Sequence, residues 1–443
     1  MSIPKNIYMV GIGGIGMSAL AQLLVHQGKR VSGSDREESP TTKLLAEKGI
    51  AVSIGHDGCL IPANTELLIY SDAIWPDNPE RMRAKEMKIP EMSYFEALGV
   101  VSKNMQTLAV TGTHGKTTTT GMLAAILKHA GKNPSAIIGS IVREFSPPAG
   151  GSNYLEGRDD LLVVEACEYK DHMLKLSPEI LVITNIELDH TDFFPNLVAL
   201  QNTFRIAAER VPVHGAIITD PNNPTIAPIL KNVSTRVVDY TKESAPTLKL
   251  IGEFNAMNAR AAKAAARAIW GDPEGQQAAY GAGISEDVID EALRNFKGSW
   301  RRFEYKGETP DGALVYDDYA HHPTAILKTI EAAREKFPDK KIVVAFHPHL
   351  YSRTKSFLKE FAEALATADR AIVAPIYAAR EKSDPSVSNR VLADMSRKLG
   401  GKVEALDSFD EIRDALLKEQ EGTLIITMGA GDIYKVAEQI IGQ

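Results

Sequence analysis

Short apolar runs alternate with longer stretches of helical spacing along the first hundred residues. Helices that lie between strands are typical of βαβ units and a parallel sheet. The elements predicted in this region are a strand in NIYMVGIG (6–13), a helix in GIGMSALAQLLVHQG (14–28), a strand in KRVSGSD (29–35), a helix in PTTKLLAEKG (40–49) and a strand in ELLIYSDAI (66–74). The pattern continues to about Lys103, where VVSKNMQ is predicted to be a linker.

The same alternation begins again twice further along the chain. The second region predicts a strand and loop in TLAVTGTHGK (107–116), a helix in TTTTGMLAAILKHAG (117–131), buried strands in DLLVVEACE (160–168) and EILVITNIELDH (179–190), and a helix in AMNARAAKAAARAIW (256–270). The third predicts strands in ALVYDDYAHH (313–322), KIVVAFHPH (341–349), RAIVAPIYAAR (370–380) and TLIITMGAGD (423–432), each followed by a helix. Pro323 suits the first turn of its helix.

The length and composition fit a folded protein with several domains. A chain of 443 residues is too long for one core, and the patterns place boundaries that give domains 1–104, 105–298 and 299–443. The net charge of -7 gives no reason to expect a nucleic-acid partner. Two cysteines in no ligand-like spacing suit a reducing compartment, and neither a signal peptide nor a membrane span is recognised. We therefore expect a cytoplasmic α/β protein.

The segment AVTGTHGKTTTTG (109–121) predicts a phosphate loop, although it breaks the strict GxxxxGK[ST] pattern, whose first glycine would fall on Val110. Gly112 and Gly115 lie between a strand and a helix, where glycines let main-chain N–H groups surround a phosphate at a helix N-terminus. Lys116 would reach the β- and γ-phosphates, and the Thr117 hydroxyl would ligate Mg²⁺. An ordinary glycine-rich turn is the alternative.

A second glycine pattern, Gly11-x-Gly13-x-x-Gly16, follows the first strand. Asp35 ends the next strand, near the acidic position of a dinucleotide fingerprint. A diphosphate would sit on this helix terminus, and Asp35 would accept a hydrogen bond from a ribose or a base. The residues alone do not distinguish an NAD site from a UDP-sugar site, and a bare packing turn is a further alternative.

Acidic and polar residues follow the buried strands of the second region. Glu165 and Glu168 end one strand, and Asn185, Glu187, Asp189 and His190 follow another. Ligands of doubly wound sheets lie beyond the carboxyl ends of the strands, so we expect these groups to face the phosphate loop. A carboxylate with Thr117 and ATP phosphates would hold Mg²⁺, and His190 would serve a second ion or be structural.

The third region concentrates polar residues after its strands. They lie in RRF (301–303), YDDYAHHPT (316–324) and HPHLYSRT (347–354). Arg302 is a candidate for stabilising a transferring phosphate, and Arg353 for pairing a carboxylate substrate. Each residue by itself is more typical of a surface or packing position, and it is their concentration at strand ends that indicates chemistry.

Motifs in order along essentially the whole chain carry a family resemblance. They are GIGGIGMSALA, VSGSD, TGTHGKTTTT, TNIELDH, NAMNA, WRRFEY, YDDYAHHPT, HPHLYSRT and MGAGDI. Together they resemble the three-domain Mur ligases of bacterial cell-wall synthesis, and most of all the members that join L-alanine to UDP-N-acetylmuramate. Single motifs are shared with folylpolyglutamate synthases.

The resemblance implies an N-terminal Rossmann-like UDP-binding domain, a central P-loop-type ATPase domain with a parallel sheet, and a C-terminal Rossmann-like domain that receives the amino acid. It implies ATP and Mg²⁺ as cofactors and an acyl-phosphate intermediate, and it leaves a monomer and a homodimer equally open. It implies no membrane partner. The residues implied for the UDP-sugar are Gly11, Gly13, Gly14, Ile15, Gly16, Ser34, Asp35, Ser71 and Ala73. Those implied for ATP are Gly112, Thr113, His114, Gly115, Lys116, Thr117, Thr118, Asn255, Asn258, Arg302 and Asp318. Those implied for the amino acid are Tyr319, His321, His349 and Arg353. The residues implied as metal ligands are Thr117, Glu165 and His190. The residues implied for catalysis are Lys116, His190, Arg302 and His321.

The sequence also departs from the family pattern. Leu350 stands where the family usually has an arginine expected to help hold the alanine carboxylate, which leaves more of that task to Arg353. Cys167 and Lys170 occupy two usually acidic positions, and Phe254 replaces a histidine. A murein-peptide ligase that attaches a recycled tripeptide to UDP-N-acetylmuramate is therefore the alternative. An NAD(P)-dependent oxidoreductase and a non-catalytic nucleotide-binding regulator are more distant hypotheses.

Overall fold

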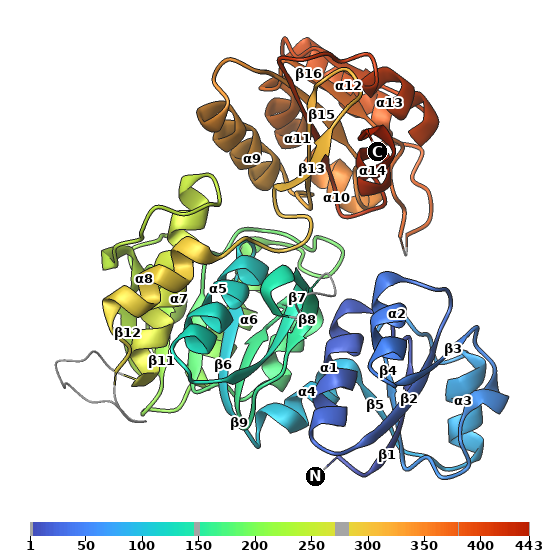
Figure 1. The fold of residues 1–443 in the computed structure, drawn as a ribbon, viewed down its shortest axis with the longest axis vertical. Helices are drawn as coiled ribbons and strands as arrows, with labels where there is room; N and C mark the ends of the chain where they lie inside the picture. The colour runs from blue at the N-terminus through green and yellow to red at the C-terminus, as the bar shows by residue number, and fades with distance from the viewer. Residues whose placement is uncertain (1–2, 146–150, 271–282, 380, 443) are drawn as a thin grey trace. The chain divides into compact units, whose positions relative to one another are not determined.

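The computed structural model describes residues 3–145, 151–270, 283–379 and 381–442. Its packing divides the chain into two compact units. The first unit comprises Met1–Ile186, Leu200–Thr247 and Met257–Lys297, and the second comprises Glu187–Ala199, Leu248–Ala256 and Gly298–Gln443. Two of the three sheets belong to the first unit and the third sheet to the second unit. Three α/β domains were predicted, and the three sheets confirm that fold class (Figure 1).

The first sheet is entirely parallel, in the order β3-β2-β1-β4-β5. Its strands are β1 (Asn6–Val10), β2 (Arg30–Asp35), β3 (Ala51–Ile54), β4 (Leu67–Tyr70) and β5 (Glu91–Ser93), and its helices are α1 (Ile15–His26), α2 (Pro40–Glu47), α3 (Pro79–Glu86) and α4 (Tyr94–Ser102). The predicted linker at residues 100–106 was partly wrong, because Val100–Ser102 complete α4. Ser93 and Glu96 form a capping box that starts this helix.

The second sheet has the order β12-β11-β10-β6-β9-β7-β8. Among the described strands of this sheet, only the edge pair β7–β8 is antiparallel. The strands are β6 (Gln106–Thr111), β7 (Pro134–Val142), β8 (Ser152–Leu155), β9 (Arg158–Glu165), β10 (Ile180–Ile183), β11 (Ala216–Thr219) and β12 (Arg236–Asp239), and the α-helices are α5 (Lys116–His129), α6 (Leu197–Glu209), α7 (Glu253–Trp270) and α8 (Glu286–Asn295). The residues of β10 are all buried, as the continuous apolar run predicted.

The third sheet has the order β13-β14-β18-β15-β16-β17, with β13–β14 as its antiparallel pair. Its strands are β13 (Glu304–Glu308), β14 (Leu314–Asp318), β15 (Lys341–Phe346), β16 (Arg370–Val373), β17 (Val403–Ala405) and β18 (Thr423–Met428). The helices are α9 (Pro323–Lys336), α10 (Tyr351–Ser356), α11 (Leu358–Ala366), α12 (Asn389–Lys398), α13 (Phe409–Leu416) and α14 (Tyr434–Ile440). Pro323 is the first residue of α9, as predicted.

Helices cover both faces of this third sheet. Successive residues of β15 alternate between two core clusters, because side chains of a strand point to opposite faces. Ile342 and Val344 belong to the cluster that contains Phe361 of α11, whereas Val343 belongs to the cluster that contains Ile412 of α13. The sheet is therefore doubly wound. Ligands of such sheets bind beyond the carboxyl ends of the parallel strands, so a site is expected there.

The buried amide of Asn153 ties the first two sheets together inside the first unit. Its Nδ2 on β8 donates to the Ser18 hydroxyl (2.8 Å) and to the Ile15 carbonyl (2.5 Å) of α1. Gln22, one turn further along α1, donates to Asn153 Oδ1 (3.3 Å). A buried amide whose hydrogen bonds are all formed holds its partners in one arrangement. The Asn153 amide therefore determines where α1 packs on the second sheet.

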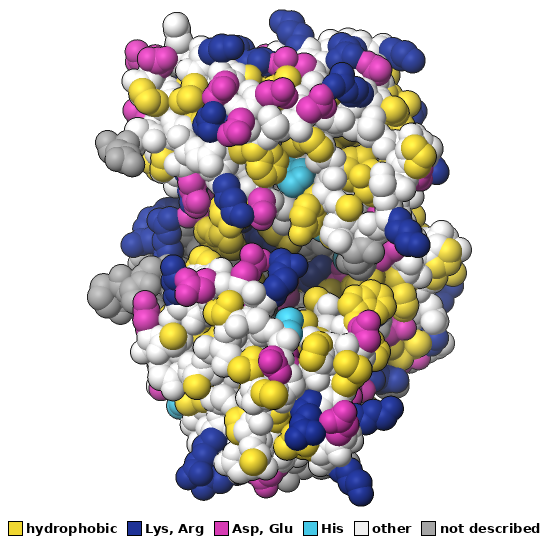
Figure 2. All heavy atoms as spheres, turned by 90° about the vertical axis from the view of Figure 1, so that its right-hand side faces the viewer, with side chains coloured by type: hydrophobic (Ala, Val, Ile, Leu, Met, Phe, Trp, Pro, Cys, Tyr) yellow, Lys and Arg dark blue, Asp and Glu magenta, His cyan; other side chains and the backbone are white. Residues whose placement is uncertain are grey.

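Charged side chains are mixed on the surface. On the face drawn in Figure 2, Lys and Arg alternate with Asp and Glu and form no extended basic area. Within the described residues, no helix combines the length and the apolar character that crossing a membrane requires.

Candidate active site

The first glycine loop is closed by its own backbone and by Asp35. The N–H groups of Gly11 and Ile12 both donate to the Ser34 carbonyl (2.8 and 3.0 Å), and the Gly13 N–H donates to Asp35 Oδ2 (2.8 Å). Gly11 has a φ of +76°, and a Cβ on Gly13 would lie 2.9 Å from Asp35 Oδ2. The glycines are therefore required by the loop itself, and Asp35 holds the loop in shape.

The other residues predicted for the UDP-sugar lie around this loop. Ser34 and Asp35 end β2, and Ser71 follows β4 with its N–H donating to the Val10 carbonyl (3.0 Å). A Cβ on Gly11 would lie 3.1 Å from the Ser71 Cβ. The structure thus brings the carboxyl ends of β1, β2 and β4 together at the N-terminus of α1, where the ligands of such sheets lie.

The second glycine loop precedes α5 and is clamped by Asn185. The His114 N–H donates to Asn185 Oδ1 (2.9 Å), and Asn185 Nδ2 donates back to the His114 carbonyl (3.0 Å). The Thr113 N–H donates to the Asn185 carbonyl (3.1 Å). Gly112 has a φ of +129°, and a Cβ there would lie 2.1 Å from Thr184 Oγ1. The sequence placed Asn185 near this loop but did not show that it would hold the loop from both sides.

Lys116 starts α5 and is folded back onto the loop. Its Nζ donates to the Gly112 carbonyl (2.5 Å) and the Thr113 carbonyl (3.2 Å), and it lies 3.0 Å from both carboxylate oxygens of buried Glu168. Burial opposes the charge, but the nearby carboxylates of Glu168 and Glu165 together outweigh it, and the pKa of Lys116 is raised. The ammonium is therefore charged at neutral pH and is positioned for a phosphate at the loop.

Glu165 and Thr117 form an oxygen-rich pair beside the loop. The Thr117 hydroxyl donates to Glu165 Oε1 (3.1 Å), and Glu165 Oε2 accepts from the Gly139 N–H (2.8 Å). A hydroxyl and a carboxylate are ligands that Mg²⁺ prefers, so these residues fit the ion. Burial, together with the charge of Glu168, raises the pKa of Cys167 to about 12, so its thiol stays protonated.

Asn258 and Asn255, both predicted near the adenine, have different surroundings. Asn258 on α7 lies at the phosphate loop, because a Cβ on Gly115 would meet its Oδ1 at 2.3 Å and Thr119 donates to that oxygen (3.2 Å). Asn255 belongs to the second unit, where its Nδ2 donates to the Ile251 carbonyl (2.7 Å). Thr118 is buried in α5.

In the second unit, the two adjacent arginines differ in role. Arg301 is buried, with its Nε on Asp317 (2.7 Å) and its terminal nitrogens on the Gly429 and Gly431 carbonyls. Arg302 places its guanidinium 5.0 Å from the centre of the Tyr319 ring. Arg301 is therefore structural, and Arg302 is the arginine that remains a candidate for chemistry.

Asp318 is held at the end of β14 by two backbone donors. It accepts from the N–H groups of Ala320 and Phe303 (2.7 Å each). Burial raises its pKa to about 6, although the charge of Arg302 lowers it. Asp318 and Arg302 therefore lie close enough to interact electrostatically, and their role in ATP binding stays a prediction.

His321 is neutral and has one defined tautomer. Its Nδ1 lies 2.9 Å from the Tyr319 carbonyl. A carbonyl only accepts, so Nδ1 carries the proton and Nε2 presents a lone pair. Burial and the charge of Arg353 hold the pKa of His321 well below its usual value. His349 is close by, with ring centres 6.3 Å apart.

Arg353, predicted to pair a substrate carboxylate, is paired with Asp189. Its Nε donates to Asp189 Oδ1 (2.8 Å), and Nη2 lies 2.8 Å from the same oxygen. Nη1 lies 3.0 Å from His349 Nδ1. Both side chains are almost fully buried, at 3% and 6% exposure. Burial alone would raise the pKa of Asp189, but Arg353 holds it well below its usual range.

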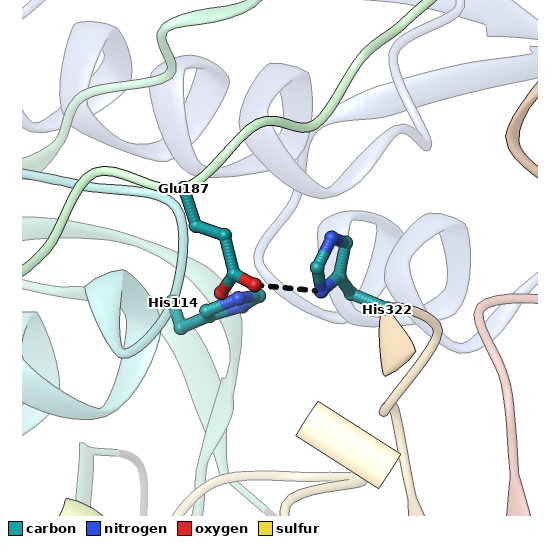
Figure 3. Close-up of side chains that lie close together, drawn as sticks. All are labelled: His114, Glu187 and His322. Carbon is teal, nitrogen blue, oxygen red and sulfur yellow. Dashed lines mark ion pairs between the residues drawn. The ribbon is translucent and has the colours of Figure 1, made fainter. Parts of the chain in front are cut away.

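The segment Glu187–Ala199 thus packs with the third sheet, which sequence reasoning missed. Glu187 Oε1 lies 4.0 Å from His322 Nδ1 and accepts from the Thr324 hydroxyl (2.5 Å), and Figure 3 shows the first of these pairs. His190, a predicted metal ligand, lies in this segment with a φ of +52°, and its N–H donates to Asp189 Oδ1 (2.7 Å). The partners are far apart in sequence and follow different strands, so no local signal links them.

The described part of the chain has three sheets flanked by helices and two glycine loops that each precede a helix. This arrangement is typical of a nucleotide-binding α/β protein. Sequence profiles of the Mur ligase family match the chain in three parts. They are the "Mur ligase family, catalytic domain" at residues 6–105, the "Mur ligase middle domain" at 110–247 and the "Mur ligase, glutamate ligase domain" at 301–431.

Individual relatives extend over the whole chain. The UDP-N-acetylmuramate–L-alanine ligase of Caldicellulosiruptor bescii is 37% identical over 99% of this chain and 98% of its own length. That of Clostridium novyi is also 37% identical, over 99% and 97%. The solved UDP-N-acetylmuramate–alanine ligase of Thermotoga maritima matches with a TM-score of 0.78, 28% identity and coverage of 99% and 98%.

A murein peptide ligase of Psychrobacter arcticus has the same fold, with a TM-score of 0.73 at 22% identity and coverage of 99% and 98%. The chain belongs to the Mur ligase family. The predicted family resemblance is thereby confirmed, and the oxidoreductase hypothesis, which rested on the first glycine loop and Asp35, is set aside.

Proposed function

We propose that this protein is an ATP-dependent ligase that joins L-alanine to the carboxylate of UDP-N-acetylmuramate in peptidoglycan precursor synthesis. The observation that carries the proposal is that two glycine loops of different design lie on one compact unit. The loop at Gly11–Gly16 would take the sugar nucleotide, and the loop at Gly112–Thr117 would take ATP. Asn153 fixes the helix of the first loop on the sheet that bears the second.

The first chemical step is transfer of the γ-phosphoryl group to the sugar carboxylate. One carboxylate oxygen attacks phosphorus, the bond to ADP breaks, and an acyl phosphate forms. Lys116 neutralises charge on the phosphates, and Thr117 with Glu165 would hold Mg²⁺, which supplies further charge neutralisation. Arg302 is the candidate for the charge that develops during transfer.

The second step is attack by alanine on the acyl carbon. The amine must be neutral to attack, and His321 Nε2, which carries a lone pair, is the candidate acceptor for the proton that the ammonium gives up. The nitrogen bonds to the acyl carbon and forms a tetrahedral intermediate. The bond to the phosphate oxygen then breaks, inorganic phosphate leaves with the second proton of the nitrogen, and the amide remains. His349, Tyr319 and Arg353 are the proposed amino-acid residues. Consumption of ATP fits a cytoplasmic location.

Phosphate release from ATP with Mg²⁺ and UDP-N-acetylmuramate tests the proposal. We expect release that depends on L-alanine, in a panel that includes glycine, L-serine and the murein tripeptide L-Ala-γ-D-Glu-meso-diaminopimelate. Release only with the tripeptide would replace the substrate by that of a murein-peptide ligase. This outcome is worth an arm of the assay, because Leu350 is 1% exposed and brings no charge to the amino-acid site.

A further inference from the structure

Tyr94 lies against the glycine loop that we assign to the sugar nucleotide. It is the first residue of α4, which begins at the Ser93 cap. A Cβ built on Gly16 would lie 2.6 Å from the Tyr94 Cζ and 2.7 Å from its Oη. The phenol therefore occupies the space that the missing side chain of Gly16 leaves. Its hydroxyl lies at the first turn of α1.

Neighbouring rings hold Tyr94 in this place. The Phe95 ring meets it edge-on (centres 4.6 Å apart) and stacks on His172 (3.7 Å, interplanar angle 14°). His172 Nε2 lies 2.5 Å from a carboxylate oxygen of Asp72. Asp72 lies between Ser71 and Ala73, two residues of the proposed UDP-sugar site. A continuous set of contacts therefore links Tyr94 to both sides of that site.

The Tyr94 hydroxyl is a donor that stays protonated. Burial raises its pKa, and the charge of Glu165 raises it further. Among the residues that the structure describes, none forms a hydrogen bond with this hydroxyl. The first turn of α1 leaves backbone N–H groups that favour an anion. The neutral O–H of Tyr94 beside them is a further hydrogen-bond donor for such an anion.

We propose that the Tyr94 hydroxyl donates a hydrogen bond to the diphosphate of the sugar nucleotide and so sets the affinity for this substrate. The inference rests on the proposed function, because that function supplies the diphosphate. The hydroxyl adds to the loop a donor from α4, an element that the glycine pattern does not include. A hydrogen bond to a charged acceptor contributes about tenfold or more in affinity.

The test compares the wild type with Tyr94→Phe in titration calorimetry with UDP and with UDP-N-acetylmuramate. We expect both dissociation constants to rise by about tenfold, with the KM for ATP unchanged. Tyr305→Phe is the matched control, since Tyr305 is 49% exposed on β13, and it should change neither constant. Thermal unfolding of each variant confirms that the fold is intact.

Each other outcome overturns the inference in a distinguishable way. Equal affinities of wild type and Tyr94→Phe for UDP would refute it and leave the proposed function standing. Weaker binding of UDP-N-acetylmuramate with unchanged binding of UDP would move the hydroxyl to the sugar or its carboxylate, away from the diphosphate. A wild type that binds neither compound would overturn the proposed function itself.

Discussion

Replacement of Asp189 by alanine should destabilise the second unit strongly. Two guanidinium nitrogens of Arg353 are within 2.8 Å of one Asp189 oxygen, and the third lies at 3.0 Å from His349. The change leaves a guanidinium of 3% exposure without its carboxylate. Breaking a buried ion pair from one side costs about 3–5 kcal/mol, because the remaining charge stays desolvated. We expect a loss of this size in the free energy of unfolding.

Urea unfolding of the full-length protein measures this loss. Glu331→Ala is the matched control, because it breaks the exposed Lys328–Glu331 pair of α9 (2.8 Å, 55% and 52% exposed). That variant should lose less than about 1 kcal/mol. The double variant Asp189→Ala/Arg353→Ala should lose clearly less than the sum of the two single variants, since it leaves no unpaired charge.

The pH dependence gives the sign of the effect. The folded pKa of Asp189 is lowered, so the pair contributes stability above the unfolded pKa, and this contribution is lost as pH falls through the folded pKa. The difference between the wild type and Asp189→Ala should therefore be constant from pH 6 to pH 8. A loss no larger than that of Glu331→Ala would refute the reasoning.

Four further changes have defined outcomes. Gly112→Ala should abolish ATP binding in a calorimetric titration, because its Cβ would lie 2.1 Å from Thr184 Oγ1 at a φ of +129°. Lys116→Met should lower kcat for phosphate release by about 10²–10³-fold, as loss of a charge-stabilising donor does. His321→Asn should lower kcat by about 10²-fold or more, and the acid limb of the wild-type kcat/KM profile should lie below pH 6.5, since burial lowers the pKa of this histidine. Burial lowers the pKa of His347 from 6.5 to about 4, so the unfolded state takes up a proton on this histidine at a higher pH than the folded state does. The free energy of unfolding of the wild type should therefore fall by about 3 kcal/mol between pH 7 and pH 4. His347→Gln should remove this part of the pH dependence, and urea unfolding at both pH values measures it.

Local signals in the sequence predicted the elements of the fold well. A run such as Ile180–Ile183 can only be a buried strand or helix segment, and its length and flanks favour the strand. Gly112 and Gly115 have positive φ, which few other residues adopt, so the glycine spacing itself reports the loop. The predicted linker at residues 100–106 was partly wrong because Val100–Ser102 complete α4, the helix that the Ser93–Glu96 capping box begins.

Contacts between distant segments were beyond the sequence patterns. Asp189 and Arg353 are 164 positions apart, and neither carries a mark of its partner. Tyr94 follows a strand of three residues and packs against Gly16. The glycine pattern alone predicts that Gly16 lies at a ligand, and it does not predict the contact with Tyr94. Periodicity determines which face of an element is buried, but it does not determine which element of another sheet buries that face.

The segment Glu187–Ala199 has a consequence for the order of events during synthesis on the ribosome. Its ionic partner Arg353 is made 164 residues after Asp189, which at about 5–20 residues per second is a delay of about 10–30 s. Throughout that interval the nascent chain carries Asp189 without Arg353, its partner in the folded protein. The second sheet can be completed first, but this segment reaches its final packing only after Arg353 has emerged.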